Sequence, residues 1–211
     1  MKQDKEFRNF CDFEVREVGE GDSKQTHIQG YALVFDSVSE DLGFRELIVR
    51  GALDNTDMSD VVLLFNHDRD KILARNNKQD GVGSLRLSVD DKGLFFDAIP
   101  TNTSYARDLI ANMESGIIGK CSFCFNLDWT DNDAQKWDWD DGVKGYDFRT
   151  IYKIARITDV SVVTNPAYES TSTTLYKRCK EDYKKEAQEE REFQELQESL
   201  NQIKLRMGLQ K

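Results

Sequence analysis

The sequence predicts an α+β fold made mainly of antiparallel strands, arranged as a closed or strongly curved β-barrel with a few flanking helices and a C-terminal helical tail. Many short segments alternate apolar and polar residues with a period of two, which is typical of half-buried strands. One internal segment, 104–116, has the helical period instead. Beyond Tyr176 the chain becomes highly charged and helix-forming. Strands that cluster around a single helix disfavour an alternating α/β fold, in which helices and strands take turns along the chain.

Composition narrows the classes of function. The chain has 211 residues and a formal net charge of −10, so it has room for one full core plus an appendage and no general attraction for nucleic acid. No apolar run approaches the ~20 residues that span a bilayer, and residues 1–10 lack the apolar core of a signal peptide. The four cysteines are too few and too scattered for a disulfide framework. We therefore expect a cytoplasmic protein that binds neither membrane nor nucleic acid.

The first part of the chain predicts a hairpin followed by a buried strand. Residues 11–18 and 26–35 alternate apolar and polar side chains on either side of a Gly-Asp-Ser turn. Residues 36–60 are irregular, with a short helix expected at 53–59. The run 61–68, Val-Val-Leu-Leu-Phe-Asn-His-Asp, is apolar until it reaches its last three residues. Such a run is too short for a buried helix and predicts an interior strand covered on both faces.

The rest of the core predicts further strands and one clear helix. Residues 68–83 are polar and bounded by glycine, which indicates an exposed loop. In the helical segment Ser104 is a suitable N-cap, apolar residues recur at helical spacing, and Gly116 is placed for the C-cap. The remaining strands, in a mostly antiparallel sheet, are expected at 84–89, 94–99, 120–127, 146–154 and 157–164.

Three polar side chains occur in or beside segments that are otherwise apolar. His67 follows the buried strand, where a rigid support and access to solvent suit a general base, although a capping or surface histidine is the simpler interpretation. Ser122 follows glycines that would let a substrate backbone approach closely, yet a hydroxyl tucked into a strand is more common than a nucleophile. Asp159 needs a partner such as an imidazole N–H if it is buried, whereas surface exposure requires none. Spacing alone leaves both interpretations open for each residue.

The pair Cys121 and Cys124 does not predict a metal or redox site. With a strand period of two these cysteines would point to opposite faces, and the chain has no second such pair to complete a zinc site. Thioredoxin-type pairs begin a helix rather than lie within a strand. Cys124 would share a face with Ser122, which makes it the alternative nucleophile. We expect neither a metal nor a cofactor.

Two segments fall outside the predicted core. Residues 128–145 hold all three tryptophans and six aspartates without the regular offsets of a calcium loop, which favours a surface hairpin beside a substrate groove. Residues 177–211 predict a charged helix with a short coiled-coil seam, which is marginal in isolation and therefore favours docking to a partner or to a second copy of the chain. The seam residues are Phe193, Leu196, Leu200, Ile203 and Met207.

Six short motifs follow one another along the chain. They are Gly30-Tyr-Ala with Phe35, Gly51-Ala, Asn66-His67-Asp68, Gly93-Leu94, Gly119-x-x-Ser122-x-x-Phe125, and Asp159-Val-Ser-Val-Val with Pro166-Ala-Tyr. No single motif is specific, but the ordered set resembles the HK97-type prohead (capsid maturation) protease family of tailed phages over about residues 13–173. The resemblance implies a fold related to the herpesvirus assemblins, which carry their site on a closed β-barrel flanked by helices.

The resemblance also implies a serine endopeptidase. His67 would be the general base, Ser122 the nucleophile, and Asp159 the acid that orients the imidazole, at a position that the family commonly fills with glutamate. The chain order of histidine, serine and acid differs from that of chymotrypsin, subtilisin and the α/β-hydrolases, but triads are defined by geometry and roles. A hydrolase of small esters is disfavoured because the chain has no Gly-x-Ser-x-Gly motif.

The implied role is in virion assembly. The enzyme would cut segments of the scaffold protein, the major capsid protein and itself inside the procapsid, in the host cytoplasm. The predicted organisation is an N-terminal arm at 1–10, a protease domain at 11–176 and the docking helix at 177–211. The alternative is an inactive relative that serves as a structural or scaffolding component of the procapsid. Retention of histidine, serine and acid favours the active enzyme.

Overall fold

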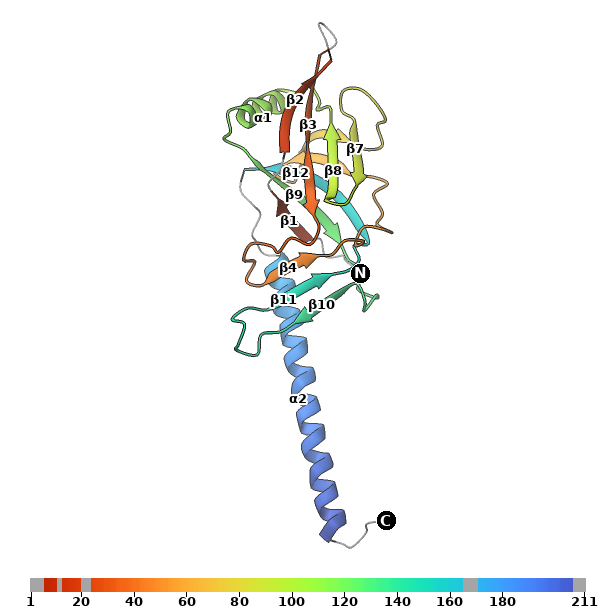
Figure 1. The fold of residues 1–211 in the computed structure, drawn as a ribbon, viewed down its shortest axis with the longest axis vertical. Coiled ribbons are helices and arrows are strands. Elements are labelled where there is room, and N and C mark those ends of the chain that lie inside the picture. Colours follow the sequence, from red (N-terminus) through yellow and green to blue (C-terminus); the bar gives the residue numbers. More distant parts are fainter. Residues whose placement is uncertain (1–5, 11–12, 20–23, 165–170, 207–211) are drawn as a thin grey trace. The chain divides into compact units, whose positions relative to one another are not determined.

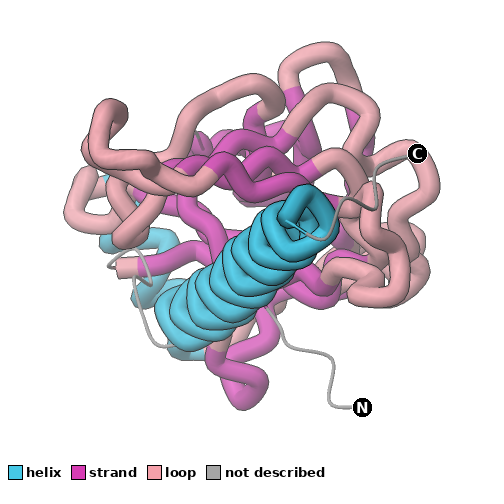
Figure 2. Tube along the Cα trace, turned by 90° about the horizontal axis from the view of Figure 1, so that it is seen from below, coloured by secondary structure: helices cyan, strands magenta, loops and turns pink. Residues whose placement is uncertain are grey.

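Figure 1 shows the computed structural model of the chain, which describes residues 6–10, 13–19, 24–164 and 171–206. The chain divides into two compact units, Met1–Glu169 and Ser170–Lys211. The described strands belong to the first unit, where they gather in the interior while the loops run around them (Figure 2). The described part of the second unit is one long helix.

The largest described sheet carries the polar residues singled out in the sequence. Its members, in spatial order, are β1 (Glu6–Phe10), β9 (Lys120–Asn126), β12 (Arg156–Val163), β5 (Val62–Phe65) and β6 (Asp68–Arg75). β12 pairs with β5 in parallel, and the other neighbours in this sheet pair antiparallel. The apolar run that predicted an interior strand is β5, which lies between β12 and β6. That prediction is confirmed.

A second sheet contains the predicted hairpin of residues 11–18 and 26–35 and the strands expected at 84–89 and 94–99. Its strands, in spatial order, are β2 (Phe13–Val18), β3 (Gln25–Val34), β8 (Gly93–Ala98) and β7 (Leu85–Val89), all paired antiparallel. Gly93 pairs with Val34, and a Cβ at Gly93 would lie 1.9 Å from the carbonyl oxygen of Leu33. The close approach of β3 to β8 at this point therefore requires glycine.

A third sheet is formed by β10 (Gln135–Asp138), β11 (Phe148–Ile151) and β4 (Arg45–Ile48), with β10 antiparallel and β4 parallel to β11. Through β10 the acidic insertion is part of this sheet. The ring of Trp137 stacks on Trp139 at 4.7 Å between centroids and meets Phe44 edge-on at 4.9 Å. Aromatic packing therefore helps to hold the insertion against β4 and β11. The residues of the candidate site lie in the largest sheet and not in this one.

Two strands replace segments that were expected to be irregular at the edges of the core. The predicted exposed loop after His67 is wrong, because its first half forms β6. Only Leu73 and Ala74 of this edge strand are buried. Its many charged residues leave no alternation of apolar and polar side chains to recognise. Residues 6–10 of the predicted arm form β1, in which Glu6 and Arg8 take the buried positions that apolar residues usually occupy. Periodicity read from apolar residues misses both strands.

The segment 36–60 also differs from expectation. It contains β4, and the short helix expected at 53–59 is wrong, because residues 51–55 form turns. Ala52 and Leu53 are buried, while their backbone is held by local and cross-chain bonds such as the N–H of Ile154 to the carbonyl of Ala52 at 2.9 Å. Tertiary pairing with the start of β12 has replaced local helical bonding there.

Helix α1 (Ser104–Glu114) confirms the internal helix, with its start shifted by one residue. The N-cap is Thr103, whose hydroxyl accepts the N–H of Ala106, and Gly116 has a φ of +74° just past the helix end. Ala106, Leu109 and Met113 are buried. They join apolar side chains from the three described sheets in one core cluster, which includes Leu33, Phe96, Phe123, Ile151 and Val160.

The architecture is α+β with mostly antiparallel strands, as the sequence predicts. Hydrogen bonding among the described strands gives three open sheets, and none of them closes on itself. The closed barrel is therefore not confirmed. The packing of three sheets around one core gives the interior that a barrel would otherwise supply.

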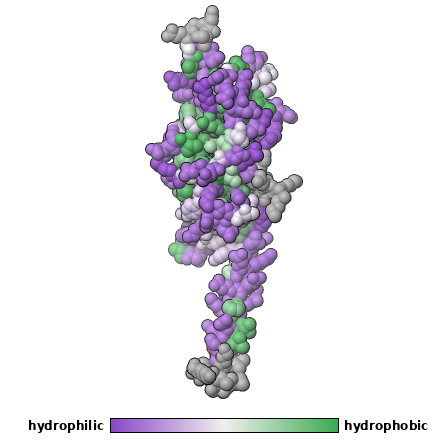
Figure 3. Space-filling model, turned by 90° about the vertical axis from the view of Figure 1, so that its right-hand side faces the viewer, coloured by the Kyte–Doolittle hydropathy of each residue, from purple (hydrophilic) through white to green (hydrophobic). Residues whose placement is uncertain are grey.

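The second unit is described by helix α2 (Thr171–Arg206). Phe193, Leu196 and Leu200 of the predicted seam are 60%, 58% and 48% exposed, and Figure 3 shows hydrophobic side chains gathered towards one end of this helix. The side chain of Ile203, and Met207 as a whole, lie outside the described residues. None of the described helices is long and apolar enough to cross a membrane.

Candidate active site

The candidate site is built on a two-residue turn between β5 and β6. Asn66 and His67 form this turn with φ values of +54° and +57°, as the type I′ hairpin turn requires. Three hydrogen bonds to β12 and the residue after it fix the turn. The N–H of Asn66 donates to the carbonyl of Val162 at 2.8 Å, and its side-chain Oδ1 accepts the N–H of Thr164 at 2.9 Å. The N–H of His67 donates to the hydroxyl of Ser161 at 3.2 Å.

The imidazole of His67 joins the other two candidate residues. Its Nε2 lies 2.7 Å from the Oγ of Ser122, and its Nδ1 lies 2.5 Å from the Oδ1 of Asp159. With the proton on Nδ1, the ring donates to the carboxylate and presents a lone pair to the serine hydroxyl. The structure therefore brings the histidine together, in a proton-transfer geometry, with a serine 55 positions and an aspartate 92 positions further along the chain.

The register of the strands explains this arrangement. β9 and β12 are neighbours, and Ser122 pairs with Ser161 while Cys124 pairs with Asp159. Paired residues point to the same face, and so do residues two apart on one strand. The shared face of Ser122 and Cys124 was predicted from the period of two. The histidine nitrogen contacts Ser122, which favours serine over cysteine as the nucleophile.

Asp159 is buried, with 3% of its surface exposed. The surface-exposed alternative is therefore wrong, and the partner that burial requires is the imidazole of His67. The hydroxyl of Thr158 donates to the second carboxylate oxygen at 3.3 Å. Because both oxygens are bonded, the carboxylate is held in one orientation beside the ring.

Ser161 is the polar residue at this site whose position the sequence did not reveal. Its Oγ lies 3.1 Å from the Nδ1 of His67 and 3.2 Å from the Oδ1 of Asp159, in addition to accepting the backbone N–H of His67. The period of two in β12 places Ser161 on the same strand face as Asp159, which is the signal that could have found it. The face is dry, because Ser161 and Val163 are 0% and 2% exposed. Ser161 thus braces both members of the pair.

The backbone amides at 116–119 and 161–165 are candidates for an oxyanion hole, and several of them are already bonded. The N–H groups of Ile117 and Ile118 both donate to the carbonyl of Asn112, as part of the end of α1. The N–H of Thr164 donates to Asn66. Asn165 lies outside the described residues. Gly119, where a Cβ would meet nothing within 4 Å, remains the open position nearest in sequence to Ser122.

Comparison with known proteins assigns the chain to a family. Residues 11–186, which include His67, Ser122 and Asp159, match the caudovirus prohead serine protease family. The chain belongs to this family. It is therefore a serine peptidase of capsid maturation. The prohead protease is also similar to the solved bacteriophage T4 capsid assembly protease, gp21, at 13% identity and a TM-score of 0.49, over 79% of this chain and 100% of that chain. No curated protein matches the sequence.

A cavity of about 430 Å³ opens on the Asp159 side of the site in the prohead protease. Both apolar and charged side chains line it, so it offers room for a substrate side chain without selecting one charge. Its walls include Leu64 and Ile72 from the β5–β6 hairpin, Asn126 from β9, and Arg156 and Thr158 from β12.

The cysteine pair and possible metal ligands concern chemistry other than that of a serine nucleophile. Cys121 and Cys124 of the protease are both buried and lie on a strand, as predicted. Within the described ranges no group of three or more His, Cys, Asp and Glu side chains is arranged to hold a metal ion.

Proposed function

We propose that Ser122, His67 and Asp159 form the catalytic triad of this prohead protease, and that the enzyme cuts segments of the scaffold and major capsid proteins inside the procapsid, in the host cytoplasm. The observation that carries the proposal is the position of one imidazole ring, 2.7 Å from the serine hydroxyl and 2.5 Å from the carboxylate. Membership of a serine peptidase family supports the reaction class. The substrates follow from the work of a prohead protease, which acts on capsid proteins.

The chemistry follows from the two ring nitrogens. The Oγ of Ser122 bonds to the scissile carbonyl carbon as its proton passes to the Nε2 of His67, and the carbonyl oxygen becomes an oxyanion. When the oxyanion collapses, the C–N bond breaks and the proton on Nε2 goes to the leaving amine. A water molecule then repeats the two steps on the acyl-enzyme, which releases the acid and restores Ser122.

Asp159 has a supporting role in this scheme. Its carboxylate accepts the Nδ1–H of His67, which selects the tautomer with a basic Nε2 and stabilises the imidazolium that forms in each step. Asp159 reaches the ring because β12, which carries it, is paired with β5, which leads directly into the turn at His67.

The test is to incubate the purified chain with scaffold and major capsid proteins and to sequence any new N-termini, including those of the chain itself. Ser122→Ala is expected to abolish every cut, whereas Cys124→Ala is expected to leave the pattern intact. The opposite outcome would identify a cysteine protease. A wild-type chain that is folded, cuts nothing and still enters procapsids would identify the inactive scaffolding relative instead.

We also propose that α2 is a docking helix that brings the protease to a partner during assembly. The exposure of Phe193, Leu196 and Leu200 supports this, because three large apolar side chains on one helix cost free energy in water unless a partner covers them. Leu196→Ser with Leu200→Ser is expected to reduce incorporation into procapsids and leave peptide cleavage unchanged. Glu195→Ser with Glu198→Ser is the matched control on the same turns. Equal incorporation of both variants would refute docking through the seam.

A further inference from the structure

The nucleophile of the proposed triad is covered. Ser122 is 0% exposed, although the side chain of His67 beside it is 13% exposed. A serine that attacks a peptide bond must come within contact distance of a substrate carbonyl, so part of the structure has to move before cleavage. The strand that carries Ser122, β9, has β12 on one edge and β1 on the other.

β1 lies directly beside the nucleophile. It pairs antiparallel with β9, and Asn9 is the register partner of Ser122. β1 is five residues long and is the outermost strand of its sheet, so it has one strand neighbour to hold it through main-chain bonds. The family match begins at residue 11, after this strand. β1 is therefore an addition to the matched region that occupies the sheet edge next to the reacting group.

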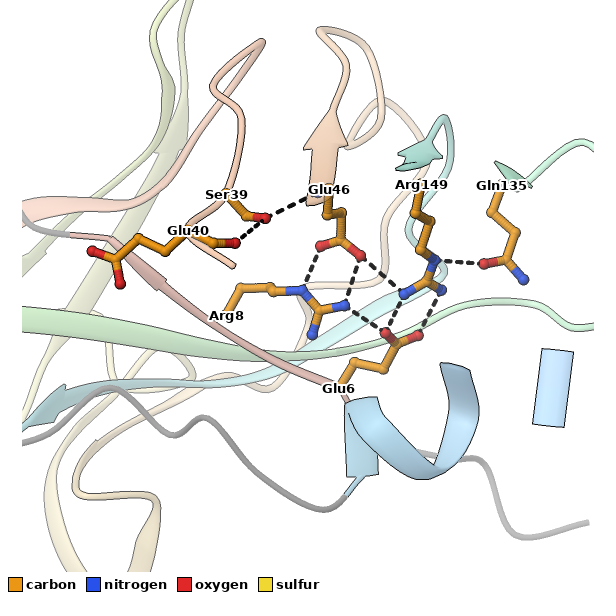
Figure 4. Close-up of polar contacts among 7 residues, drawn as sticks. All are labelled: Glu6, Arg8, Ser39, Glu40, Glu46, Gln135 and Arg149. Atoms are coloured by element: carbon orange, nitrogen blue, oxygen red, sulfur yellow. Dashed lines mark hydrogen bonds and ion pairs between the residues drawn. The ribbon is translucent and has the colours of Figure 1, made fainter. Parts of the chain in front are cut away.

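Four buried charges attach β1 to the third sheet, as Figure 4 shows. Arg8 donates to Glu6 at 2.8 Å and to Glu46 of β4 at 2.7 Å, and Arg149 of β11 donates to Glu6 at 2.9 Å and to Glu46 at 3.0 Å. All four residues are 3% exposed or less. In addition, the guanidinium of Arg8 lies 5.3 Å from the centre of the Phe125 ring.

The quartet divides into two neutral halves. Glu6 and Arg8 belong to β1, while Glu46 and Arg149 stay with the third sheet and contact each other at 3.0 Å. When β1 leaves, neither half carries an uncompensated charge. The attraction within the quartet is offset by the cost of taking four charges out of water, so the strand is held with high specificity and modest net strength. An apolar strand of the same size would not separate from the third sheet as one of two charge-matched pairs.

The slot that β1 fills is selective for charge. Burial by itself tends to raise the pKa of Glu6, but Arg149 and Arg8 outweigh it and hold this pKa below the ordinary value, so the slot takes an ionised carboxylate. Residues two apart on a strand share a face. A segment with an acidic residue followed two positions later by a basic residue would match Arg149 and Glu46 as Glu6 and Arg8 do.

We propose that the edge of β9 beside Ser122 is a binding site for an extended substrate segment that carries a carboxylate and, two residues later, a guanidinium, and that β1 occupies this site in the resting enzyme. The inference rests on the proposed function. A substrate segment would add to β9 as a strand, which is a common mode of peptide recognition. Displacement of β1 by a matching segment then brings that segment beside Ser122.

The test compares the rate at which a small fluorophosphonate labels Ser122 in the full chain and in a charge-swapped chain. Glu6→Arg with Arg8→Glu keeps the net charge and composition but sets like charges against Arg149 and Glu46. We expect labelling about tenfold faster, because the open form becomes a larger fraction of the population. Glu17→Lys with Lys24→Glu, a swap of an exposed ion pair, is the control and is expected to label at the wild-type rate.

A peptide competition identifies the occupant. An acetylated and amidated peptide of sequence Glu-Phe-Arg-Asn-Phe, copied from β1, is expected to slow labelling of the swapped chain. The same peptide with its Glu and Arg exchanged is expected to leave labelling unchanged. If the swapped chain does not fold, as judged by its melting curve, Glu6→Gln with Arg8→Gln replaces it, since this pair of changes leaves Glu46 and Arg149 matched.

The outcomes separate the two proposals. Equal labelling of wild-type and swapped chains at Ser122, or equal effects of the two peptides, overturns the inference while leaving the triad intact. Absence of labelling in every variant shows that Ser122 is not an activated nucleophile, in which case the proposed function fails and the inference fails with it. Faster labelling of the swapped chain together with selective protection by the β1 peptide supports the inference.

Discussion

The protease contains two histidine–aspartate pairs among its described residues, and only one of them also contacts a serine hydroxyl. His67 and Asp159 approach to 2.5 Å between Nδ1 and Oδ1, and His27 of β3 and Asp97 of β8 approach to 2.7 Å between the same atoms. The two histidine side chains are also similarly exposed, at 13% and 15%. An imidazole bonded to a carboxylate is therefore not sufficient to define a site.

The pairs differ in what meets the other ring nitrogen. The Nε2 of His67 contacts the hydroxyl of Ser122, whereas no hydrogen bond joins the Nε2 of His27 to any described residue. Ser84 lines the same cavity of about 310 Å³ as His27 and Asp97 without bonding to the ring. Support differs as well, since His67 is held in a turn with positive φ and His27 lies within a regular strand. The comparison teaches that the two pairs are distinguished by the third group and by the fixed backbone, which only the proposed catalytic pair has among the described residues.

The largest expected effect comes from deleting each histidine. His67→Ala is expected to lower kcat/KM by about 10⁴-fold or more, because base and nucleophile act as one unit. His27→Ala is expected to leave kcat/KM near the wild-type value. The measurement is cleavage of a capsid-protein segment, with melting curves to show that both variants are folded. Comparable losses in the two variants would contradict the distinction drawn between the pairs.

Replacing each aspartate by asparagine is the next test. Asp159→Asn is expected to reduce kcat by about 10³- to 10⁴-fold, because the amide no longer enforces the tautomer with a basic Nε2. Asp97→Asn is expected to change kcat little, since no described hydroxyl is bonded to the His27 ring from which it could take a proton. Wild-type kcat in Asp159→Asn would move the search for the orienting group to Asp68 or Ser161.

Removing the hydroxyl of Ser161, which contacts the His67–Asp159 pair, should have a smaller effect. Ser161→Ala deletes the hydroxyl that contacts both His67 and Asp159, and we expect kcat to fall by about tenfold with KM unchanged, since the ring is less well oriented. The loss of a buried hydrogen bond should also lower stability by about 1 kcal/mol. A lower melting temperature with an unchanged kcat would reduce Ser161 to a structural role.

The smallest effect is expected from the turn that carries His67. Asn66→Ala removes the bond to the N–H of Thr164 and places alanine at a φ of +54°, which we expect to cost about 1 to 2 kcal/mol of stability. Asn66→Gly removes the same bond but accepts the positive φ, so it should cost less. Denaturant unfolding of the two variants measures the difference. Equal losses would show that the φ angle contributes nothing to holding the histidine.

Much of this site was predictable because its parts have recognisable local sequence patterns. An apolar run that stops at Asn-His-Asp indicates a buried strand with a polar end, and a period of two places Ser122 and Cys124 on one face. The predicted need for an imidazole partner at Asp159 follows from the cost of burying a carboxylate alone. Those local patterns, with the ordered motifs, identified the three residues, whose catalytic roles stay a proposal.

Other features could not be read because their residues satisfy one another across the chain. β1 has charged residues in its buried positions, and only Glu46 and Arg149, 38 and 143 residues from their partners, make that burial tolerable. β4 lies in a segment with too few apolar residues to show a period, and its partner β11 is more than 100 residues away. The barrel was expected from the many short strands and from the resemblance, and the described strands pair into three open sheets.

The sequence by itself determined the periodic elements, the buried strand β5, the helix α1 and the identity of the polar residues that interrupt apolar strands. These are local properties, set by side-chain spacing and by caps and turns within a few residues. The tertiary structure alone decided that β9 lies between β1 and β12, that Ser161 braces His67, and that Ser122 is covered in the resting chain. Strand order and burial depend on which distant segments pair, and that choice is made by the packing of the whole core and its buried charges rather than by any one stretch.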